Sequence, residues 1–444
     1  MSAFLDCLGA SGEVGRSAFL LHTDKKIMLD YGIKIFDKSG KPHYPLDCDV
    51  ATDASVTNMS RTSKCSRHRI AGHLENDTQP NFAIITHAHL DHSGFVPALY
   101  KKTKIRWYAT PPTRELCNVL WQDSMKIMGD ELPYHNSHFK KSMKYWNPIL
   151  YGQPIQSGET TVTMLDAGHI CGAAMVLIEY GNKRMLYTGD FKCEETYMHK
   201  GACNVEDIDV LIIESTYAMR EHPTRRKLEE RFMEEIRETI EAGGNVLLPA
   251  FALGRTQELL PMIRKHFRDI PFFVDGMGKE ITKIYLNYQK YLKDAKQLKK
   301  AVKSVNMVRE PWQRREATKQ PGIILTSAGM MSGGPVLNYI QRLLPESKVI
   351  FTGYNIEGTN GWKLLNNGEI TINGKDLKID LQVEYLDFSA HAGRNEILNF
   401  IKHANPEKIV LVHGDDTKAF EKELREDFGY DAIAPVLGDR VVLY

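Results

Sequence analysis

The sequence predicts an α/β protein, and three observations support this class. Short apolar runs separated by turn residues fill the first half of the chain and predict consecutive strands. From Asp209 onward, apolar strands alternate with amphipathic helices, a pattern typical of parallel strands covered by helices. With 444 residues, of which 42% are apolar and 25% charged, the chain can bury a large core, which excludes broad disorder.

Strands separated by turns are expected in the first half. Leu116, Val119 and Leu120 recur at helical spacing and predict a helix over 113–128, with Thr110 or Thr113 as its cap. Gly181-Asn182 between two apolar runs predicts a hairpin, because this dipeptide suits a two-residue turn. The expected strands span residues 4–8, 17–22, 26–30, 82–86, 106–109, 174–180 and 183–188.

Strand and helix alternate through the second half. Gly243-Gly244 is expected to end the helix that starts near Thr224, because glycine adopts the backbone conformation that closes a helix. The expected helices span 224–242, 255–267, 336–344, 394–403 and 417–427. The expected strands span 210–213, 246–248, 272–274, 323–326, 349–352, 382–387 and 409–413.

Composition restricts the cellular compartment and the kinds of binding partner that we expect. No apolar run approaches the roughly 18 residues of a membrane span, and the N-terminus lacks the pattern of a secretory signal, so we expect no membrane partner. Seven scattered cysteines without a C-x-x-C pair argue against a disulfide framework and for a reducing compartment, most simply the cytoplasm. A net charge of +1 means that local basic patches would hold any acidic partner.

Two segments depart from the regular pattern. Residues 38–80 are polar and aperiodic, which favours a long loop or insertion. Within it, Cys48, Cys65, His68 and His73 form a candidate structural metal site, although their spacing is irregular. Residues 279–319 carry twelve Lys/Arg against four Asp/Glu, which indicates either a solvated helix face or a surface for phosphates.

The stretch 86–94 carries the clearest chemistry. His87, His89 and His92 surround Asp91 within six residues, directly after a predicted strand. Burying these groups together is costly unless they bind a cation, and His and Asp ligands without Cys suit zinc or a similar metal. A single ion that keeps an open position rarely takes four adjacent protein ligands, so the cluster favours two ions.

Further candidate ligands lie at the ends of other predicted strands or in glycine-containing turns. Taken singly, each residue also suits a purely structural role, as a turn former, a helix cap or a core histidine. Open α/β sheets collect ligands outside the carboxyl ends of their strands, so these positions can converge on one cleft. Together with the 86–94 stretch they predict a shared site; the residues are Asp30, His169, Asp190, Glu214, His391 and His413.

These residues, in this order, resemble the signature of the metallo-β-lactamase fold and the further motifs of its β-CASP branch, the nucleic-acid-processing nucleases. Segments 251–258, 327–335 and 353–359 are also similar to that branch, and the likeness to archaeal relatives of the cleavage and polyadenylation specificity factor endonuclease subunit covers almost the whole chain. The resemblance implies a four-layer αββα domain from residues 1–208 and 385–444, with an inserted α/β β-CASP domain at 209–384.

The resemblance also implies a dinuclear zinc site with Asp190 as the bridging ligand. One Zn²⁺ would be held by His87, His89, His169 and Asp190, and the other by Asp91, His92, Asp190 and His413. Two ions about 3.5–4 Å apart supply hydroxide near neutral pH and neutralise transition-state charge. Among the catalytic residues, Asp91 binds a metal, Asp30 orients ligands, and His391 with Glu214 forms the general acid.

Phosphate contacts are expected around the glycine-rich stretch 328–334. Its backbone N–H groups join a strand to a helix and can form an anion nest, although such loops are more often simple turns. The candidate substrate contacts are Ser327, Gly329, Gly333, Arg255 and Ser389.

The expected function is a zinc-dependent ribonuclease, endonucleolytic first and 5′→3′ exonucleolytic as a second mode, leaving a 5′-phosphate and a 3′-hydroxyl. RNA is the expected partner, with a homodimer or an RNA-processing complex as further assemblies. Three alternatives stay open: a thioester or lactone hydrolase, a non-catalytic scaffold subunit, and a DNA-repair nuclease. The second-half strand–helix pattern argues against the first alternative, and the complete set of ligands argues against the second.

Overall fold

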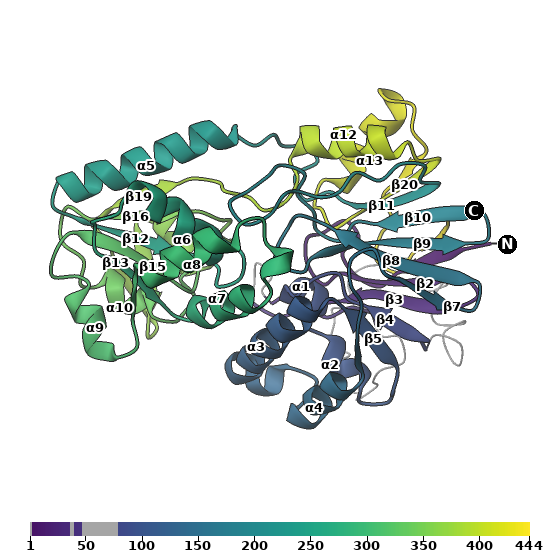
Figure 1. Ribbon diagram of the computed structural model, residues 1–444, viewed down its shortest axis with the longest axis horizontal. Coiled ribbons are helices and arrows are strands. Elements are labelled where there is room, and N and C mark those ends of the chain that lie inside the picture. The colour runs from purple at the N-terminus through teal and green to yellow at the C-terminus, as the bar shows by residue number, and fades with distance from the viewer. Residues whose placement is uncertain (1, 36–39, 47–78) are drawn as a thin grey trace.

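The computed structural model describes residues 2–35, 40–46 and 79–444. Most of the predicted 38–80 loop, and all four residues of the Cys48, Cys65, His68 and His73 cluster, lie outside the described residues. The described chain forms two bodies side by side, a sandwich of two sheets and a unit around a third sheet (Figure 1).

Two seven-stranded sheets face each other across an apolar layer that includes Leu5, Phe19, Val176 and Val410. The first sheet has the order β22-β1-β2-β3-β4-β5-β6, and the second β21-β20-β11-β10-β9-β8-β7. The first comprises β1 Phe4–Cys7, β2 Ala18–His22, β3 Lys26–Tyr31, β4 Phe82–Ile84, β5 Arg106–Ala109, β6 Trp146–Pro148 and β22 Arg440–Val442. The second comprises β7 Pro154–Ser157, β8 Thr160–Asp166, β9 Ala174–Tyr180, β10 Lys183–Tyr187, β11 Val210–Glu214, β20 Lys408–Val412 and β21 Ala432–Ile433.

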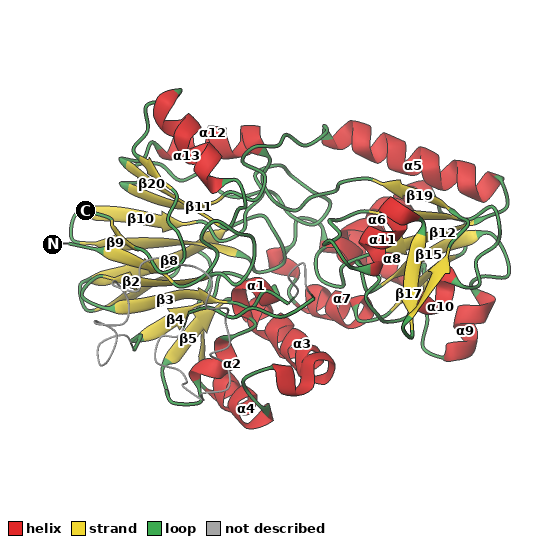
Figure 2. Ribbon diagram, turned by 180° about the vertical axis from the view of Figure 1, so that it is seen from behind, coloured by secondary structure: helices red, strands yellow, loops and turns green. Residues whose placement is uncertain are grey.

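Helices cover both outer faces of the sandwich. On the side of the first sheet lie α1 Leu90–Ser93, α2 Val96–Leu99, α3 Pro111–Met128 and α4 Asn136–Lys144. On the side of the second sheet lie α12 Arg394–Ala404 and α13 Thr417–Glu426 (Figure 2). The result is the predicted four-layer αββα arrangement, assembled from both ends of the chain: β1 pairs with β22, and β11 with β20.

A third, all-parallel sheet forms the inserted unit, in the order β14-β13-β15-β12-β16-β19. Its strands are β12 Asn245–Pro249, β13 Phe272–Asp275, β14 Asn306–Met307, β15 Gly322–Thr326, β16 Lys348–Phe351 and β19 Gln382–Tyr385. One face packs on α5 Arg225–Glu241, α6 Arg255–His266, α7 Gly278–Asn287 and α8 Ala295–Lys303, and the other on α10 Val336–Ile340 and α11 Asn360–Asn367. The short helix α9 Pro311–Glu316 and the hairpin β17 Glu369–Ile372 with β18 Lys375–Lys378 complete it.

Parallel pairing determines where the loops of this unit gather. All strands of the third sheet point the same way, so the loops that follow β12, β15, β16 and β19 leave one edge. The chain leaving β19 continues through Leu386 to His391, which places this edge beside the sandwich. A Cβ on Gly254, in the loop after β12, would approach Ile170 Cγ2 to 3.0 Å, so this loop lies next to His169.

Most predicted elements are confirmed, and the following differ. The helix predicted over 113–128 begins at Pro111, so Thr110 occupies the N-cap position as predicted, but its Oγ1 donates to Gly172 O at 2.7 Å and makes no capping hydrogen bond. The helix predicted over 336–344 ends at Ile340, before the chain reaches Pro345. No prediction was made for several short elements, which are the helices α1, α2, α4 and α7–α9, the strands β6, β7, β14 and β21, and the β17–β18 hairpin.

Strand β11 bears on the domain boundaries. It pairs with β10 and β20 in the second sheet, although the predicted boundary at 208 assigned it to the insertion. We therefore propose that the inserted domain begins after β11, because Val210–Glu214 completes the sandwich.

Two expected absences concern the described ranges only. In them, Cys7, Cys117, Cys171, Cys193 and Cys203 are free thiols. Across the same ranges, every helix is too short or too polar to cross a bilayer.

Candidate metal centre

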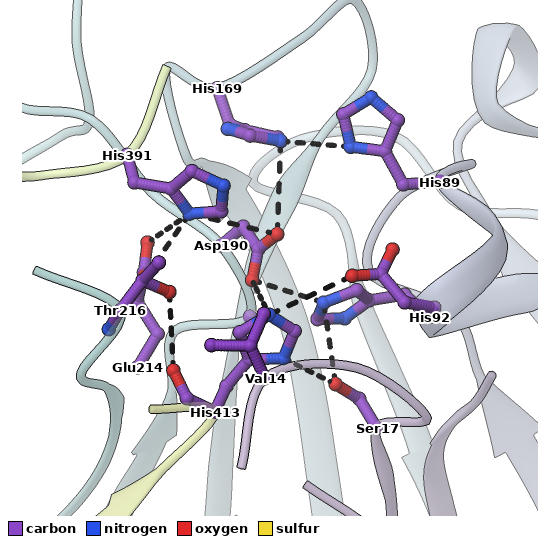
Figure 3. A network of polar contacts seen from close by, with 12 residues as sticks. Val14, Ser17, His89, His92, His169, Asp190, Glu214, Thr216, His391 and His413 are labelled. Carbon is purple, nitrogen blue, oxygen red and sulfur yellow. Dashed lines mark hydrogen bonds and ion pairs between the residues drawn. The ribbon is translucent and has the colours of Figure 1, made fainter. Parts of the chain in front are cut away.

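Loops from four strands converge at one end of the sandwich. His87 follows β4, Asp190 follows β10, Glu214 ends β11 and His413 follows β20. His391 lies on the segment that connects β19 of the third sheet to α12 of the sandwich, where the two bodies meet, and its side chain joins the site (Figure 3).

The first group of candidate ligands offers three imidazoles and one carboxylate. One ligand atom from each of the four residues lies within 4.8 Å of the others. His169 Nε2 lies 3.1 Å from His89 Nδ1 and 3.8 Å from Asp190 Oδ2, and His87 Nε2 lies 3.5 Å from the same oxygen. This group contains the residues predicted for one zinc ion: His87, His89, His169 and Asp190.

The second group shares Asp190 with the first. His92 Nε2 lies 3.0 Å from Asp190 Oδ1, and His413 Nε2 lies 3.8 Å from that oxygen and 3.7 Å from Asp91 Oδ2. Again one atom from each residue lies within 4.8 Å of the others: Asp91, His92, Asp190 and His413. Asp190 presents Oδ2 to the first group and Oδ1 to the second.

Unsatisfied buried atoms test whether these residues suit a metal. His87 Nε2 and His413 Nε2 are buried and have no hydrogen-bond partner, and the buried Asp190 Oδ1 has only its ionic contacts with His92 and His413. A buried polar atom without a partner costs about 1–3 kcal/mol, and several in one cluster indicate a missing ligand. Burial holds the pKa of His87 and His169 well below the usual imidazole range, which favours the neutral form that binds metal. The donor set therefore fits a cation.

Asp190 is charged despite complete burial. Burial alone would raise its pKa, but the imidazoles of His92 and His413 outweigh this effect and hold the pKa of Asp190 well below the usual carboxyl range. Within the described ranges, this carboxylate is common to all three His/Asp/Glu groups that could hold a metal.

A buried hydrogen-bond network orients the second group. Asp30 Oδ2 lies 2.7 Å from His92 Nδ1 and accepts from Tyr187 Oη at 2.8 Å, while Thr86 donates to both oxygens of Asp30. Burial alone would lower the pKa of His92, but Asp190 and Asp30 outweigh it and raise this pKa well above the usual imidazole range, so His92 Nε2 must lose its proton before it can bind a metal. Ser17 Oγ bonds with His413 Nδ1 at 2.7 Å.

Sequence reasoning missed several members of this network. Ser17 directly precedes the apolar strand β2, Tyr187 ends the strand β10, and the backbone oxygen of Ala390, 2.8 Å from His169 Nδ1, has no sequence signal. Each joins segments more than 150 residues apart, which a single sequence cannot reveal.

His391 and Glu214 form a pair beside Asp190. His391 Nδ1 lies 3.1 and 3.2 Å from the two oxygens of Glu214 and 3.8 Å from Asp190 Oδ2. Burial alone would lower the pKa of His391, but the carboxylates of Glu214 and Asp190 outweigh it and raise the pKa to about 9. A cationic imidazole is a poor metal ligand, so His391 is suited to holding a proton.

The predicted substrate contacts lie near this edge but already have internal partners. Arg255 is buried, donates to Glu258 and lies over the ring of Phe388. Ser327 Oγ accepts from the N–H of Met277, and Ser389 Oγ accepts from the N–H of His391.

The predicted glycine contacts differ from each other. A Cβ on Gly329 would approach the backbone N of Phe251 to 2.9 Å, so Gly329 permits close packing of two loops. Gly333 has open space around it. Phosphate binding by these five residues stays a prediction.

The αββα sandwich, the parallel inserted unit and the His/Asp cluster define a metallo-hydrolase. Family models match the chain over the same regions. The metallo-β-lactamase superfamily matches residues 62–201, the Beta-Casp domain matches 256–364, and the Zn-dependent metallo-hydrolase RNA specificity domain matches 376–435.

Relatives match over nearly the full chain. The chain is 36% identical over 450 residues to "Probable RNase MJ4" of Methanocaldococcus jannaschii, covering 98% of each protein. It is 34% identical to "RNase aCSPSF2" of Saccharolobus solfataricus, covering 100% of this chain and 86% of that protein. It is 32% identical to "Transcription termination factor FttA" of Methanocaldococcus jannaschii, covering 93% and 67%.

A solved structure shares the fold. It is described as a protein of unknown function from Enterococcus faecalis V583 and aligns with a TM-score of 0.61 at 14% identity over 100% of both chains. The chain belongs to the β-CASP branch of the metallo-β-lactamase family, and it is a metal-dependent hydrolase.

Proposed function

We propose that this chain is a zinc-dependent ribonuclease that hydrolyses RNA phosphodiester bonds endonucleolytically, with 5′→3′ exonucleolytic cutting as a second mode. The observation that carries the proposal is the pair of four-residue ligand groups that share Asp190, with the His391–Glu214 pair beside them. Two Zn²⁺ ions held there would supply Lewis-acid chemistry toward water and phosphate oxygens.

The chain's own residues would prepare the reaction in three ways. Asp190 and the imidazoles hold the charge of the metal centre in a buried setting, where electrostatic interactions are strong. Asp30 and Ser17 keep His92 and His413 in fixed orientations. Asp91, with a side chain 32% exposed, lies at the open side of the centre, where a phosphodiester can approach.

His391 completes the chemistry as the proton donor. Glu214 accepts a hydrogen bond from the Nδ1–H of His391, which leaves the Nε2–H free for the substrate. As water adds to phosphorus and the P–O3′ bond breaks, the leaving 3′ oxygen takes this proton and becomes a hydroxyl. The other product carries a 5′-phosphate, and the proton that the attacking water releases passes to solvent and restores the proton on His391, so atoms and charges balance without a redox partner.

RNA is favoured over the alternative substrates by the match of an RNA specificity domain to residues 376–435, the part that carries His391 and His413. Two of the relatives are named as RNases. The inserted unit argues against a thioester or lactone hydrolase, which needs no second domain, and the complete ligand groups argue against a scaffold subunit.

Metal analysis with product mapping tests this proposal. We expect about two zinc ions per chain and cutting of a circular RNA, which requires an internal attack. His87→Ala with Asp91→Ala should abolish both, whereas the exposed pair His403→Ala with Asp427→Ala should change neither. Hydrolysis of a thioester or of single-stranded DNA in preference to RNA, or protein without a transition metal, would refute it.

A further inference from the structure

Glu396 in the first turn of α12 lies between the two loops that carry Asp190 and His391. Its carboxylate takes four donors, two on each oxygen. Oε1 accepts from the N–H groups of Cys193 and Glu194 at 3.0 and 2.7 Å. Oε2 accepts from Lys192 Nζ at 2.6 Å and from the N–H of Gly393 at 2.9 Å. Three of these four donors belong to residues that follow Asp190 in the sequence, and the fourth, the N–H of Gly393, follows His391.

The charge on Glu396 is balanced by a buried cation. The side chain of Lys192 is only 3% exposed, and its ammonium lies 2.6 Å from Glu396 and 3.8 Å from Glu194. Burial alone would raise the pKa of Glu396, but Lys192 and the backbone N–H groups outweigh it and lower the pKa. Removing the carboxylate would therefore leave a buried ammonium with a weak partner.

Further contacts, besides those of Glu396, connect the same two loops. The N–H of Ala392 donates to Phe191 O at 2.7 Å, and the N–H of Phe191 donates to Glu214 Oε1 at 3.0 Å. The ring of Phe191 also packs on Phe400 of α12, with ring centroids 4.9 Å apart. Residues 191–194 and 391–393 are thus joined from both sides of Glu396.

We propose that Glu396 is a positioning residue that holds His391 at proton-transfer distance from a phosphodiester at the Asp190 centre. The inference rests on the proposed ribonuclease function. His391 lies 3.8 Å from Asp190 Oδ2 only while the two loops keep their relative position (Figure 3). A shift of about 1 Å between a catalytic group and its substrate can cost on the order of 10²-fold in rate.

Two substrates with different leaving groups distinguish a loss of His391 positioning from a general loss of stability. A ribose 3′ oxygen needs a proton as it departs, whereas p-nitrophenolate leaves readily without one. Glu396→Ala should therefore lower kcat on an RNA oligonucleotide by about 10²-fold, and on bis(p-nitrophenyl) phosphate by less than about threefold. Glu396→Gln keeps an oxygen for Cys193 and Glu194 and should fall between wild type and Glu396→Ala.

A matched control lies on the same face of the molecule. Glu423 of α13 binds Arg394, the first residue of α12, without touching either loop. Glu423→Ala should leave the rates on both substrates within about twofold of wild type. Zinc content should stay equal in all of these variants.

A double-mutant cycle completes the test. In a His391→Ala background, Glu396→Ala should change the RNA rate little, because the group that it positions is gone. Equal losses on both substrates, additive losses in the cycle, or loss of zinc would overturn the positioning role. Wild-type protein that hydrolyses the p-nitrophenyl ester but not RNA would instead refute the proposed function.

Discussion

Asp30 shows how one buried carboxylate can control a metal site without binding the metal. It is fully buried, its φ is +56°, and it receives hydrogen bonds from Thr86 and Tyr187 while it contacts His92 Nδ1. Asn tolerates the same left-handed backbone, so Asp30→Asn removes the charge without straining the chain. We expect zinc affinity to fall by about 10–100-fold, measured by competition with a chelator.

Tyr187→Phe provides a graded comparison for this change. It removes one donor to Asp30 and keeps the ring that packs edge-on to Phe19 at 5.6 Å. The loss of zinc affinity should be several-fold smaller than for Asp30→Asn. Equal zinc affinity in wild type and Asp30→Asn would show that Asp30 does not orient His92.

His199 should make the fold sensitive to acid. Burial lowers its pKa to about 4, and Glu258 offsets only part of that effect. The unfolded chain therefore binds more protons than the native state between pH 6.5 and 4, and stability falls as the pH falls through this range. At pH 5 the loss attributable to His199 is about 2 kcal/mol.

Thermal unfolding measured at pH 7 and pH 5 checks this. The drop in Tm should be several degrees smaller in His199→Gln than in wild type, because Gln does not titrate. Identical drops would mean that His199 is protonated as readily in the folded chain as in the unfolded one.

At the residue scale, the sequence predicted the candidate metal ligands better than the residues that orient them. His87, His89 and Asp91 were recognisable because they are neighbours in the chain, and the structure brings them together with Asp190. Ser17 was not recognisable as a support, because its role depends on a hydrogen bond to His413, 396 residues away. Spacing carries information about neighbours only, so distant hydrogen bonds need the fold.

At the scale of elements, the helix α8 lies within the basic 279–319 segment and carries a stripe of lysines on its exposed face. Leu298 and Ala301 face the core, and four lysines are exposed. None of the four has a carboxylate within reach among the described residues. The segment before α8 joins the loop after Asp190, because the N–H of Lys293 donates to Met198 O at 2.8 Å. The stripe comprises Lys296, Lys299, Lys300 and Lys303.

We expect the stripe to contact RNA phosphates beyond the metal centre. Lys296→Ala with Lys300→Ala preserves the helix, since alanine favours it. Binding of a single-stranded RNA of about 20 nucleotides should weaken, and the slope of log Kd against log salt should fall by about 1.4, or about 0.7 per lost phosphate contact.

The matched control is a lysine pair at the same spacing on another helix. Lys140 and Lys144 of α4 are exposed at positions four apart, as are Lys296 and Lys300. Lys140→Ala with Lys144→Ala should leave both the affinity and the salt slope unchanged. If both pairs have the same effect, the binding is a general response to charge and the stripe has no special role.

Helices and strands with strong local sequence patterns were predicted better than those with weak patterns. The 224–242 helix was predictable because its apolar residues repeat and Gly243, with φ +91°, ends it. Helix α8 was hidden because only Leu298 and Ala301 mark its buried face among lysines. The strand β11 was recognisable as a strand, but its membership in the second sheet depends on pairing with β20, almost 200 residues away.

Considered as a whole molecule, the metal centre joins parts of the chain that are far apart in sequence. Its ligands come from residue 87 through residue 413, and they span the two parts of the sandwich on either side of the insertion. One apolar cluster also continues from Leu20 in the sandwich to Leu259 in the inserted unit. Ions bound at this junction stabilise only the folded arrangement, because the unfolded chain does not hold the ligands together.

Removing the metal should therefore lower the stability of the whole chain. At a free zinc concentration about 100 times the Kd, each ion contributes about 2.7 kcal/mol, so chelation should lower the Tm by about 5 °C or more. Calorimetry with and without a chelator measures the shift, and His87→Ala with Asp91→Ala serves as the control, since it has lost ligands from both groups. A wild-type Tm that does not respond to chelation would mean that these buried imidazoles and carboxylates are held together by the protein alone, and the metal-based ribonuclease proposal would lose its physical basis.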